Sequence, residues 1–305
     1  MKDGIVGATD SIELQKMRIF LYTHLARMYM KTIFLAFIFS LFLVSCKKEK
    51  SIPFFLEDGM PCIEISISDI QADKLIFGVD TGCYSACFYL GNIEKIYHAF
   101  SDTDLEFWTS RGADIKLADD KTIDSIGFYN VKSGKVDFPK LWIEYDKKLV
   151  NLGFNRVGLL GYKDLEKFGV VVFDFKRKKL ILSEQKVNKN RFPLLKDEYE
   201  DHLYIPLKID GEEYYGLLDT GYKTDGVLCL SVNENAGFPD WVTVQIGDIL
   251  YKDVFCVWHS EGEFSDQKIA ENPNEILGDT ILLGNAFFQN HRVQLDFERM
   301  EFAMD

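Results

Sequence analysis

A strand-like pattern of apolar and polar positions occurs twice along the chain, and each copy ends in the tripeptide Asp-Thr-Gly. In the first copy an alternating segment at 63–67 is followed by an apolar run at 75–79. In the second copy the corresponding segments are 203–209 and 214–218, joined by the turn signal Asp210–Gly211. Short apolar runs bounded by turn residues are typical of strands, and Asp-Gly is a strong hairpin signal. Each copy is therefore predicted to be a strand, a turn and a second strand that ends at an aspartate.

The two copies also agree downstream of the tripeptide. Each has a short segment ending in Leu-Leu-Gly, then a short helical pattern, then a run rich in apolar residues. These segments are 158–161, 162–168 and 170–175 in the first copy, and 281–284, 285–290 and 293–297 in the second. Closely spaced strands with few helices predict a mainly β protein, and the internal repeat predicts two similar lobes. We place the lobes at 57–187 and 188–305, with the polar segment 184–198 as the linker between them.

The first part of the chain has a different pattern. An apolar run at 33–44, preceded by Lys31, is too short to span a bilayer, which takes about 20 residues. Its length is typical of the apolar core of a secretory signal. The run ends in Leu-Val-Ser-Cys, and charged residues follow Cys46. This arrangement resembles the lipobox of bacterial lipoproteins, and the resemblance implies a signal peptide at 30–45, lipidation of Cys46 and a tether at 46–56.

By this resemblance the mature protein belongs to the bacterial cell envelope, where Cys46 anchors it in the lipid bilayer and the chain faces the periplasm or the exterior. Residues 1–29 do not fit a signal, which usually begins a few residues before its apolar core. We expect them to be a non-native extension that arises from a mis-assigned translation start. An ordinary signal peptide with an unrelated cysteine is the open alternative.

Composition excludes several functional classes. The chain has 35 basic and 48 acidic residues and a net charge of −13, which disfavours binding to nucleic-acid phosphates. No C-x-x-C pair occurs, and the histidines show no ligand spacing, so we expect no metal site. No G-x-S-x-G motif is present for a nucleophilic serine. We expect the cysteines after Cys46 to be buried small residues; they are Cys62, Cys83, Cys87, Cys229 and Cys256.

The two Asp-Thr-Gly tripeptides, at matching places in a repeat, resemble those of the aspartic peptidases, in particular the bacterial retropepsin-like proteins. The resemblance covers about residues 60–305. It implies two pseudo-symmetric closed β lobes in one chain, which is expected to be a monomer, with Asp80 and Asp219 as the catalytic pair. Two close carboxyls share one proton, activate a water and hydrolyse a peptide bond. The implied substrate is a peptide or protein, and no cofactor or metal is expected.

The resemblance also assigns supporting roles to residues beside the pair. They are Thr81, Gly82, Leu160 and Gly161 in the first half, and Thr220, Gly221, Leu283 and Gly284 in the second. The threonine hydroxyls are expected to bond across the lobe interface, the glycines to allow a tight turn, and the Leu-Gly pairs to pack behind the loops. A hairpin at 115–123, with Ala118, Asp119 and Asp120 at its tip, is the candidate flap over the substrate. The alternative is an ordinary surface hairpin.

The sequence departs from the family pattern directly after each tripeptide. The family usually has a small or hydroxyl residue there, whereas this chain has Cys83 and Tyr222. The bulky Tyr222 side chain could reach a carboxylate or block the cleft. Two alternatives to an endopeptidase therefore stay open: an inactive lipoprotein of the same fold that binds a peptide or protein partner, and a purely structural envelope lipoprotein.

Overall fold

The protein's structure is a computed structural model that describes part of the chain. The described residues are 17, 20–25, 27–33, 50–70, 72–89, 109–110, 113–118, 123–146, 155–183, 190–197, 202–222, 227–229, 239–258 and 280–305. The chain divides into two compact units, Met1–Lys48 and Glu49–Asp305. Each unit is described by itself.

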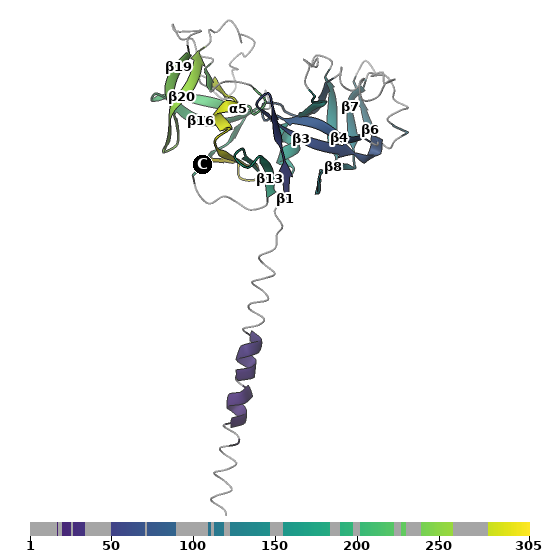
Figure 1. The fold of residues 1–305 in the computed structure, drawn as a ribbon, viewed down its shortest axis with the longest axis vertical. Coiled ribbons are helices and arrows are strands. Elements are labelled where there is room, and N and C mark those ends of the chain that lie inside the picture. The colour runs from purple at the N-terminus through teal and green to yellow at the C-terminus, as the bar shows by residue number, and fades with distance from the viewer. Residues whose placement is uncertain are drawn as a thin grey trace, which may run out of the picture. The chain divides into compact units, whose positions relative to one another are not determined.

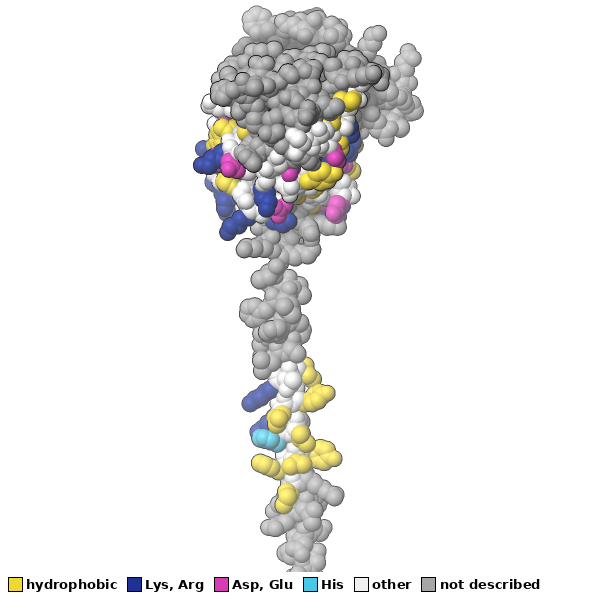
Figure 2. Space-filling view, turned by 90° about the vertical axis from the view of Figure 1, so that its right-hand side faces the viewer, with side chains coloured by type: hydrophobic (Ala, Val, Ile, Leu, Met, Phe, Trp, Pro, Cys, Tyr) yellow, Lys and Arg dark blue, Asp and Glu magenta, His cyan; other side chains and the backbone are white. Residues whose placement is uncertain are grey.

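In the first unit, residues 20–25 and 27–33 are helical. Their apolar side chains are exposed, as the hydrophobic side chains along this segment in Figure 2 show. Within the described residues no helix is both long and apolar enough to cross a membrane. Residues 34–49, which hold most of the predicted signal core and Cys46, lie outside the described part of the chain.

The second unit consists of β-sheets, and its described residues form three of them. The sheet of the first half has the strand order β6-β7-β10-β5-β11-β4-β3-β8-β9, with β2 paired to β3. The 3-10 turn Ser68–Ile70 follows β3. The strands are β2 (Phe55–Glu57), β3 (Met60–Ile67), β4 (Ala72–Val79), β5 (Ala86–Tyr89), β6 (Asp114–Leu117), β7 (Ile123–Phe128), β8 (Val131–Ser133), β9 (Val136–Asp137), β10 (Leu141–Asp146) and β11 (Gly158–Leu160).

The sheet of the second half has the order β15-β16-β17-β21-β18-β20-β19. Its strands are β15 (Leu195–Lys196), β16 (Leu203–Ile209), β17 (Glu212–Leu218), β18 (Val227–Cys229), β19 (Pro239–Ile246), β20 (Ile249–Trp258) and β21 (Thr280–Leu283). Figure 1 shows β3, β4, β6 and β7 gathered in one half of this unit and β16, β19 and β20 in the other.

The halves share one topology. In each, the strand that leads into Asp-Thr-Gly pairs in parallel with the strand that ends in Leu-Leu, with Val79 opposite Leu160 and Leu218 opposite Leu283. The next strand, β5 or β18, pairs antiparallel with that Leu-Leu strand and parallel with β10 or β20. A short helix follows each Leu-Leu-Gly, α4 (Tyr162–Glu166) or α5 (Asn285–Phe288). The predicted mainly β fold with two similar halves is confirmed.

A third sheet is built from both halves, in the order β1-β13-β12-β22-β23-β14. Its strands are β1 (Lys50–Pro53), β12 (Val170–Asp174), β13 (Lys179–Ser183), β14 (Arg191–Pro193), β22 (Arg292–Asp296) and β23 (Glu301–Met304). The two halves meet where β12 pairs antiparallel with β22. Phe173 and Phe302 in this sheet are fully buried and belong to a core that continues into both halves. The shared sheet therefore fixes the halves against each other beneath the candidate site.

Two segments that the sequence predicted as irregular contain strands instead. Strand β1 and most of β2 lie in the predicted tether at 46–56, where the Ile52 and Phe54 side chains are buried, at 1% and 5% exposure. The predicted linker contains β14 and β15, which pair with β23 and β16. Pro193 lies in β14 at the edge of its sheet, a position that tolerates a missing N–H donor. The described body of the protein therefore includes residues 50–57, and strands β14 and β15 occupy part of the predicted linker.

Candidate active site

The two aspartates lie at equivalent ends of strands. Asp80 follows β4, and its N–H donates to the Leu160 carbonyl at 3.0 Å. Asp219 follows β17, and its N–H donates to the Leu283 carbonyl at 3.1 Å. Leu160 and Leu283 are both fully buried. The parallel pairing of each half thus ends at its aspartate and holds the backbone of the loop in place.

Two buried threonines join the loops. The Thr81 hydroxyl donates to the Leu218 carbonyl at 2.7 Å and accepts the Thr220 N–H at 3.0 Å. In return, the Thr220 hydroxyl donates to the Val79 carbonyl at 2.8 Å and accepts the Thr81 N–H at 3.1 Å. Thr81 and Thr220 are 1% and 2% exposed. The four bonds are reciprocal, so the two halves fix each other's loops at the place where the carboxyls project.

The tripeptide glycines show how closely the carboxyls approach the opposite loop. A Cβ added to Gly82 would lie 2.5 Å from Cγ of Asp219, and one added to Gly221 would lie 2.2 Å from Cγ of Asp80. Real Cβ atoms do not approach other atoms so closely, so only glycine fits at either position. Each carboxyl is therefore packed against the loop of the other half, and the two acids face each other.

Backbone donors and burial set the charge state of the pair. Asp80 Oδ1 accepts the Gly82 N–H at 2.9 Å, and Asp219 Oδ1 accepts those of Gly221 at 2.9 Å and Tyr222 at 2.8 Å. Burial raises the pKa of both carboxyls, and the neighbouring Asp219 raises that of Asp80 further. The two side chains are also hydrogen-bonding partners. Such a pair binds one proton over a wide pH range and titrates as a unit.

The Leu-Leu-Gly glycines lie where each helix begins. Gly161 comes so close to the chain after the first tripeptide that an added Cβ would lie 2.4 Å from the Tyr84 carbonyl. The next N–H, of Tyr162, donates to the Cys83 carbonyl at 3.0 Å. In the second half the equivalent N–H, of Asn285 after Gly284, donates to the Tyr222 carbonyl at 3.0 Å. The start of each helix thus supports the residue that follows Asp-Thr-Gly.

Cys83 and Tyr222, the two departures from the family pattern, differ in their surroundings. Cys83 is half-buried beside Cys87, and its thiol lies 3.1 Å from the Ser85 carbonyl. The Tyr222 side chain is 36% exposed. Among the described residues, the recorded contact between Tyr222 and the pair is made by the Tyr222 backbone N–H. Tyr222 therefore contributes a donor to Asp219 that does not depend on its side chain.

The other cysteines after Cys46 were predicted to be buried, and those that the structure describes are buried. Cys62, Cys87 and Cys256 are at most 4% exposed, and they form no disulfide within the described part of the chain. Side-chain features of Cys229 lie outside the described part of the structure.

The described residues at the base of the candidate flap form a β-hairpin. Strands β6 and β7 pair antiparallel from Asp114 opposite Gly127 to Leu117 opposite Ile123. Ala118 is exposed, whereas Asp119 and Asp120 at the predicted tip lie outside the described residues.

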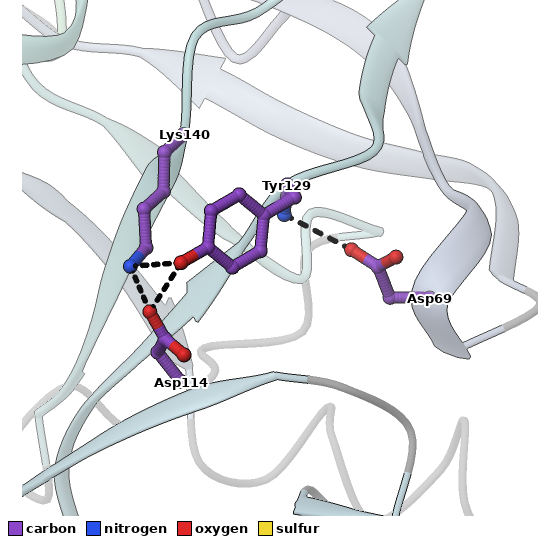
Figure 3. Close-up of polar contacts among 4 residues, drawn as sticks. All are labelled: Asp69, Asp114, Tyr129 and Lys140. Atoms are coloured by element: carbon purple, nitrogen blue, oxygen red, sulfur yellow. Dashed lines mark hydrogen bonds and ion pairs between the residues drawn. The ribbon is translucent and has the colours of Figure 1, made fainter.

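A polar cluster ties the base of this hairpin to its neighbours (Figure 3). The Lys140 ammonium pairs with Asp114 and donates to the Tyr129 hydroxyl at 2.9 Å, and that hydroxyl donates to Asp114. The Tyr129 N–H donates to Asp69 at 3.0 Å. Lys140 also lies 4.2 Å from the centre of a Trp142 ring. The cluster is at the surface, where individual ion pairs contribute little stability, so its main effect is to fix the position of β6.

One residue near the pair was not singled out by the sequence analysis. His202 immediately precedes β16, the strand that pairs with β17, and it lies within electrostatic reach of Asp219. Counting back along the hairpin from the Asp210–Gly211 turn would have placed His202 opposite Asp219. A single histidine without ligand spacing is usually structural or exposed, so no motif pointed to His202.

Comparison with known proteins supports the fold. No family model matches the chain, and no curated protein matches it. Among solved structures, the aspartic proteinase from Irpex lacteus aligns with a TM-score of 0.53 at 11% identity, over 84% of this chain and 96% of that chain. Basic 7S globulin from soybean aligns with a TM-score of 0.48 at 10% identity, over 84% and 94% of the two chains. The alignment with the Irpex lacteus proteinase shows that the chain has a fold of the aspartic proteinase type.

Proposed function

We propose that the mature chain is an exported, lipid-anchored aspartic endopeptidase. The observation that carries this proposal is the pair of Asp-Thr-Gly loops joined by the Thr81–Thr220 bonds, with Asp80 and Asp219 packed against opposite loops. A fold of this type does not by itself imply activity. The proposal rests on the site, in which two buried carboxyls with raised pKa values face each other. Few structural roles require such an arrangement.

The site supports hydrolysis by an activated water. The ionised carboxylate takes a proton from the water, and the water oxygen forms a bond to the substrate carbonyl carbon. The protonated carboxyl donates its proton to the carbonyl oxygen. The carbon–nitrogen bond of the resulting diol then breaks, and the leaving nitrogen takes a proton from the pair. One peptide and one water give a carboxylic acid and an amine. No protein atom becomes covalently attached to the substrate.

The candidate lid and the anchor complete the proposal. The β6–β7 hairpin closes over an extended peptide and excludes bulk water. Cys46 precedes β1 by four residues, which span at most about 14 Å when extended. A lipid on Cys46 would therefore hold the catalytic body close to the bilayer surface and favour peptides located there.

The anchor is tested by metabolic labelling with a clickable fatty acid in a bacterial host. We expect label and membrane association in the wild type and neither in Cys46→Ser, because the thiol is the acylated group. Cys62→Ser is the matched control, since Cys62 is buried in the body and should leave labelling unchanged. Equal labelling of wild type and Cys46→Ser would contradict the anchor and leave the peptidase proposal standing.

The second candidate function is a peptide-binding lipoprotein without turnover, which the bulky Tyr222 beside Asp219 favours. Tyr222→Ser separates the two functions when cleavage of a peptide library is followed by mass spectrometry. We expect cleavage by the wild type and a change of less than about tenfold, or 1.4 kcal/mol, in kcat/KM for the variant, because the Tyr222 backbone N–H that donates to Asp219 stays in place. Tyr84→Ser, at another exposed tyrosine, is the control. A silent wild type with an active Tyr222→Ser variant would establish the binding function instead.

A further inference from the structure

The two carboxyls of the pair are not equivalent in their hydrogen bonds. Asp219 Oδ1 accepts two backbone N–H groups, from Gly221 and Tyr222. Asp80 Oδ1 accepts that of Gly82, whereas the next N–H, of Cys83, is directed to the backbone carbonyl of Asp80 at 3.3 Å. Donors directed at a carboxylate stabilise its charged form. The backbone alone therefore favours ionisation of Asp219 over ionisation of Asp80.

The neighbouring strands add a second difference. In the second half Tyr204 pairs with Leu217, and continuing this register by two residues brings His202 opposite Asp219. In the first half Cys62 pairs with Gly78, and the same step brings Met60 opposite Asp80. Residues directly opposite in an antiparallel pair lie on the same face of the sheet. The duplicated halves thus place an ionisable imidazole beside one acid and an uncharged thioether beside the other.

The charged groups near Met60 and His202 do not remove this difference between the two halves. The Met60 sulfur lies 3.0 Å from the Arg156 guanidinium, but Arg156 faces Glu57, whose carboxylate is 3.5 Å away. On the other side, His202 packs edge-to-face on the Tyr204 ring at 6.3 Å.

Among the described residues, further charges near His202 come from the segment before it and from the pair itself. Its carbonyl accepts the Asp197 N–H at 3.1 Å, and Asp197 is buried. Lys196 on β15 points to the Tyr84 and Tyr162 rings, with its ammonium 5.8 and 5.6 Å from their centres. Burial raises the pKa of both carboxyls; at Asp219 the hydrogen bonds and the neighbouring His202 imidazole oppose that rise, whereas at Asp80 the neighbouring Asp219 adds to it.

We propose that His202 is a positioning residue that keeps the shared proton on Asp80 and leaves Asp219 ionised. In the hydrolysis proposed above, on which the catalytic consequence rests, Asp219 is then the base that takes the proton from water. Asp80 is the acid that donates to the substrate carbonyl. An imidazole is suited to this role because it can bear a positive charge beside one carboxyl, whereas the thioether of Met60 at the matching position cannot.

The test is carboxyl ¹³C NMR of the full chain labelled at aspartate, titrated with pH, with the two signals assigned by Asp80→Asn and Asp219→Asn. We expect the lower apparent pKa of the pair to belong to Asp219. It should rise by at least about half a unit in His202→Met, roughly a threefold change in the proton-binding constant. His202→Gln, which keeps a polar side chain, replaces His202→Met in the titration if the Met variant does not fold. His291→Gln, whose ring packs on Tyr251 away from the pair, is the control and should change nothing.

An unchanged pair in both folded His202 variants, or a lower pKa assigned to Asp80, would overturn the inference. This readout needs no turnover, so an inactive protein with the expected titration would refute the proposed function alone. In an active protein, the acid limb of the kcat/KM profile should move to higher pH in the His202 variants with KM little changed. Cleavage with an unmoved acid limb would refute the role of His202 and leave the proposed function intact.

Discussion

Asp80→Asn and Asp219→Asn should each reduce peptide cleavage by roughly 10³-fold or more, and we expect the fold to be retained. Either change removes a group that moves a proton in the reaction, and proton transfer by a positioned side chain contributes about 10²–10⁴-fold. Because the two acids act as a unit, the double variant should be no slower than the slower single variant. Asp137→Asn, at an exposed carboxylate that pairs with Lys132 on the surface, is the matched control and should retain nearly full activity. Cleavage that survives in either dyad variant would contradict the mechanism.

The raised pKa values of Asp80 and Asp219 are the reason why we expect the Asn variants to keep the fold. Burial raises the pKa of both acids above the ordinary value of 3.8, so the native state binds more protons than the unfolded chain just above that pH. Their contribution to stability is therefore present below about pH 3.8 and is lost as the pH rises through the native pKa values. An Asn cannot ionise. We expect the free energy of unfolding of Asp80→Asn to fall less with rising pH than that of the wild type, as measured by urea denaturation at several pH values.

Thr81→Val or Thr220→Val should destabilise the protein by about 2–5 kcal/mol. Each change leaves a buried carbonyl and a buried N–H of the opposite loop without their partner, at about 1–3 kcal/mol for each group. This is a large part of the 5–15 kcal/mol that is typical of a folded domain. Denaturant unfolding measures the change, and Thr243→Val, on a partly buried strand position, is the control.

The double variant tests whether the threonines form one network. The Thr81 hydroxyl and the Thr220 N–H are partners, as are the Thr220 hydroxyl and the Thr81 N–H. Contacting residues of one network are not additive, so Thr81→Val with Thr220→Val should cost clearly less than the sum of the single changes. Strict additivity, or a loss below about 0.5 kcal/mol in both single variants, would show that the loops are held together by other contacts.

Local signals were sufficient for the parts of the fold that lie close in sequence. The strands before Asp80 and Asp219, the Asp210–Gly211 turn and the hairpin at 115–123 were all predicted, because alternation and turn residues report on neighbouring positions. The repeat itself predicted that the acids occupy equivalent ends of strands.

Pairings between distant segments could not be predicted in this way. The β12–β22 pairing joins Val170 to Asp296 across the two halves, and no local pattern specifies such a partner. The strand at Lys50–Pro53 was missed because its short apolar content, mainly Ile52, is buried only by pairing with β13 far along the chain. His202 was missed for a related reason, since its relevance comes from strand register and not from a motif.

The central claim is that Asp80 and Asp219 together activate a water for attack on a peptide bond. Cleavage of a mapped peptide in H₂¹⁸O, analysed by mass spectrometry in a single turnover, tests it most directly. The account predicts one ¹⁸O atom in each new carboxyl terminus, no covalent peptide–protein adduct at any time, and no labelled product from Asp80→Asn or Asp219→Asn. A trapped acyl-protein adduct, or labelled product from either variant, would contradict it.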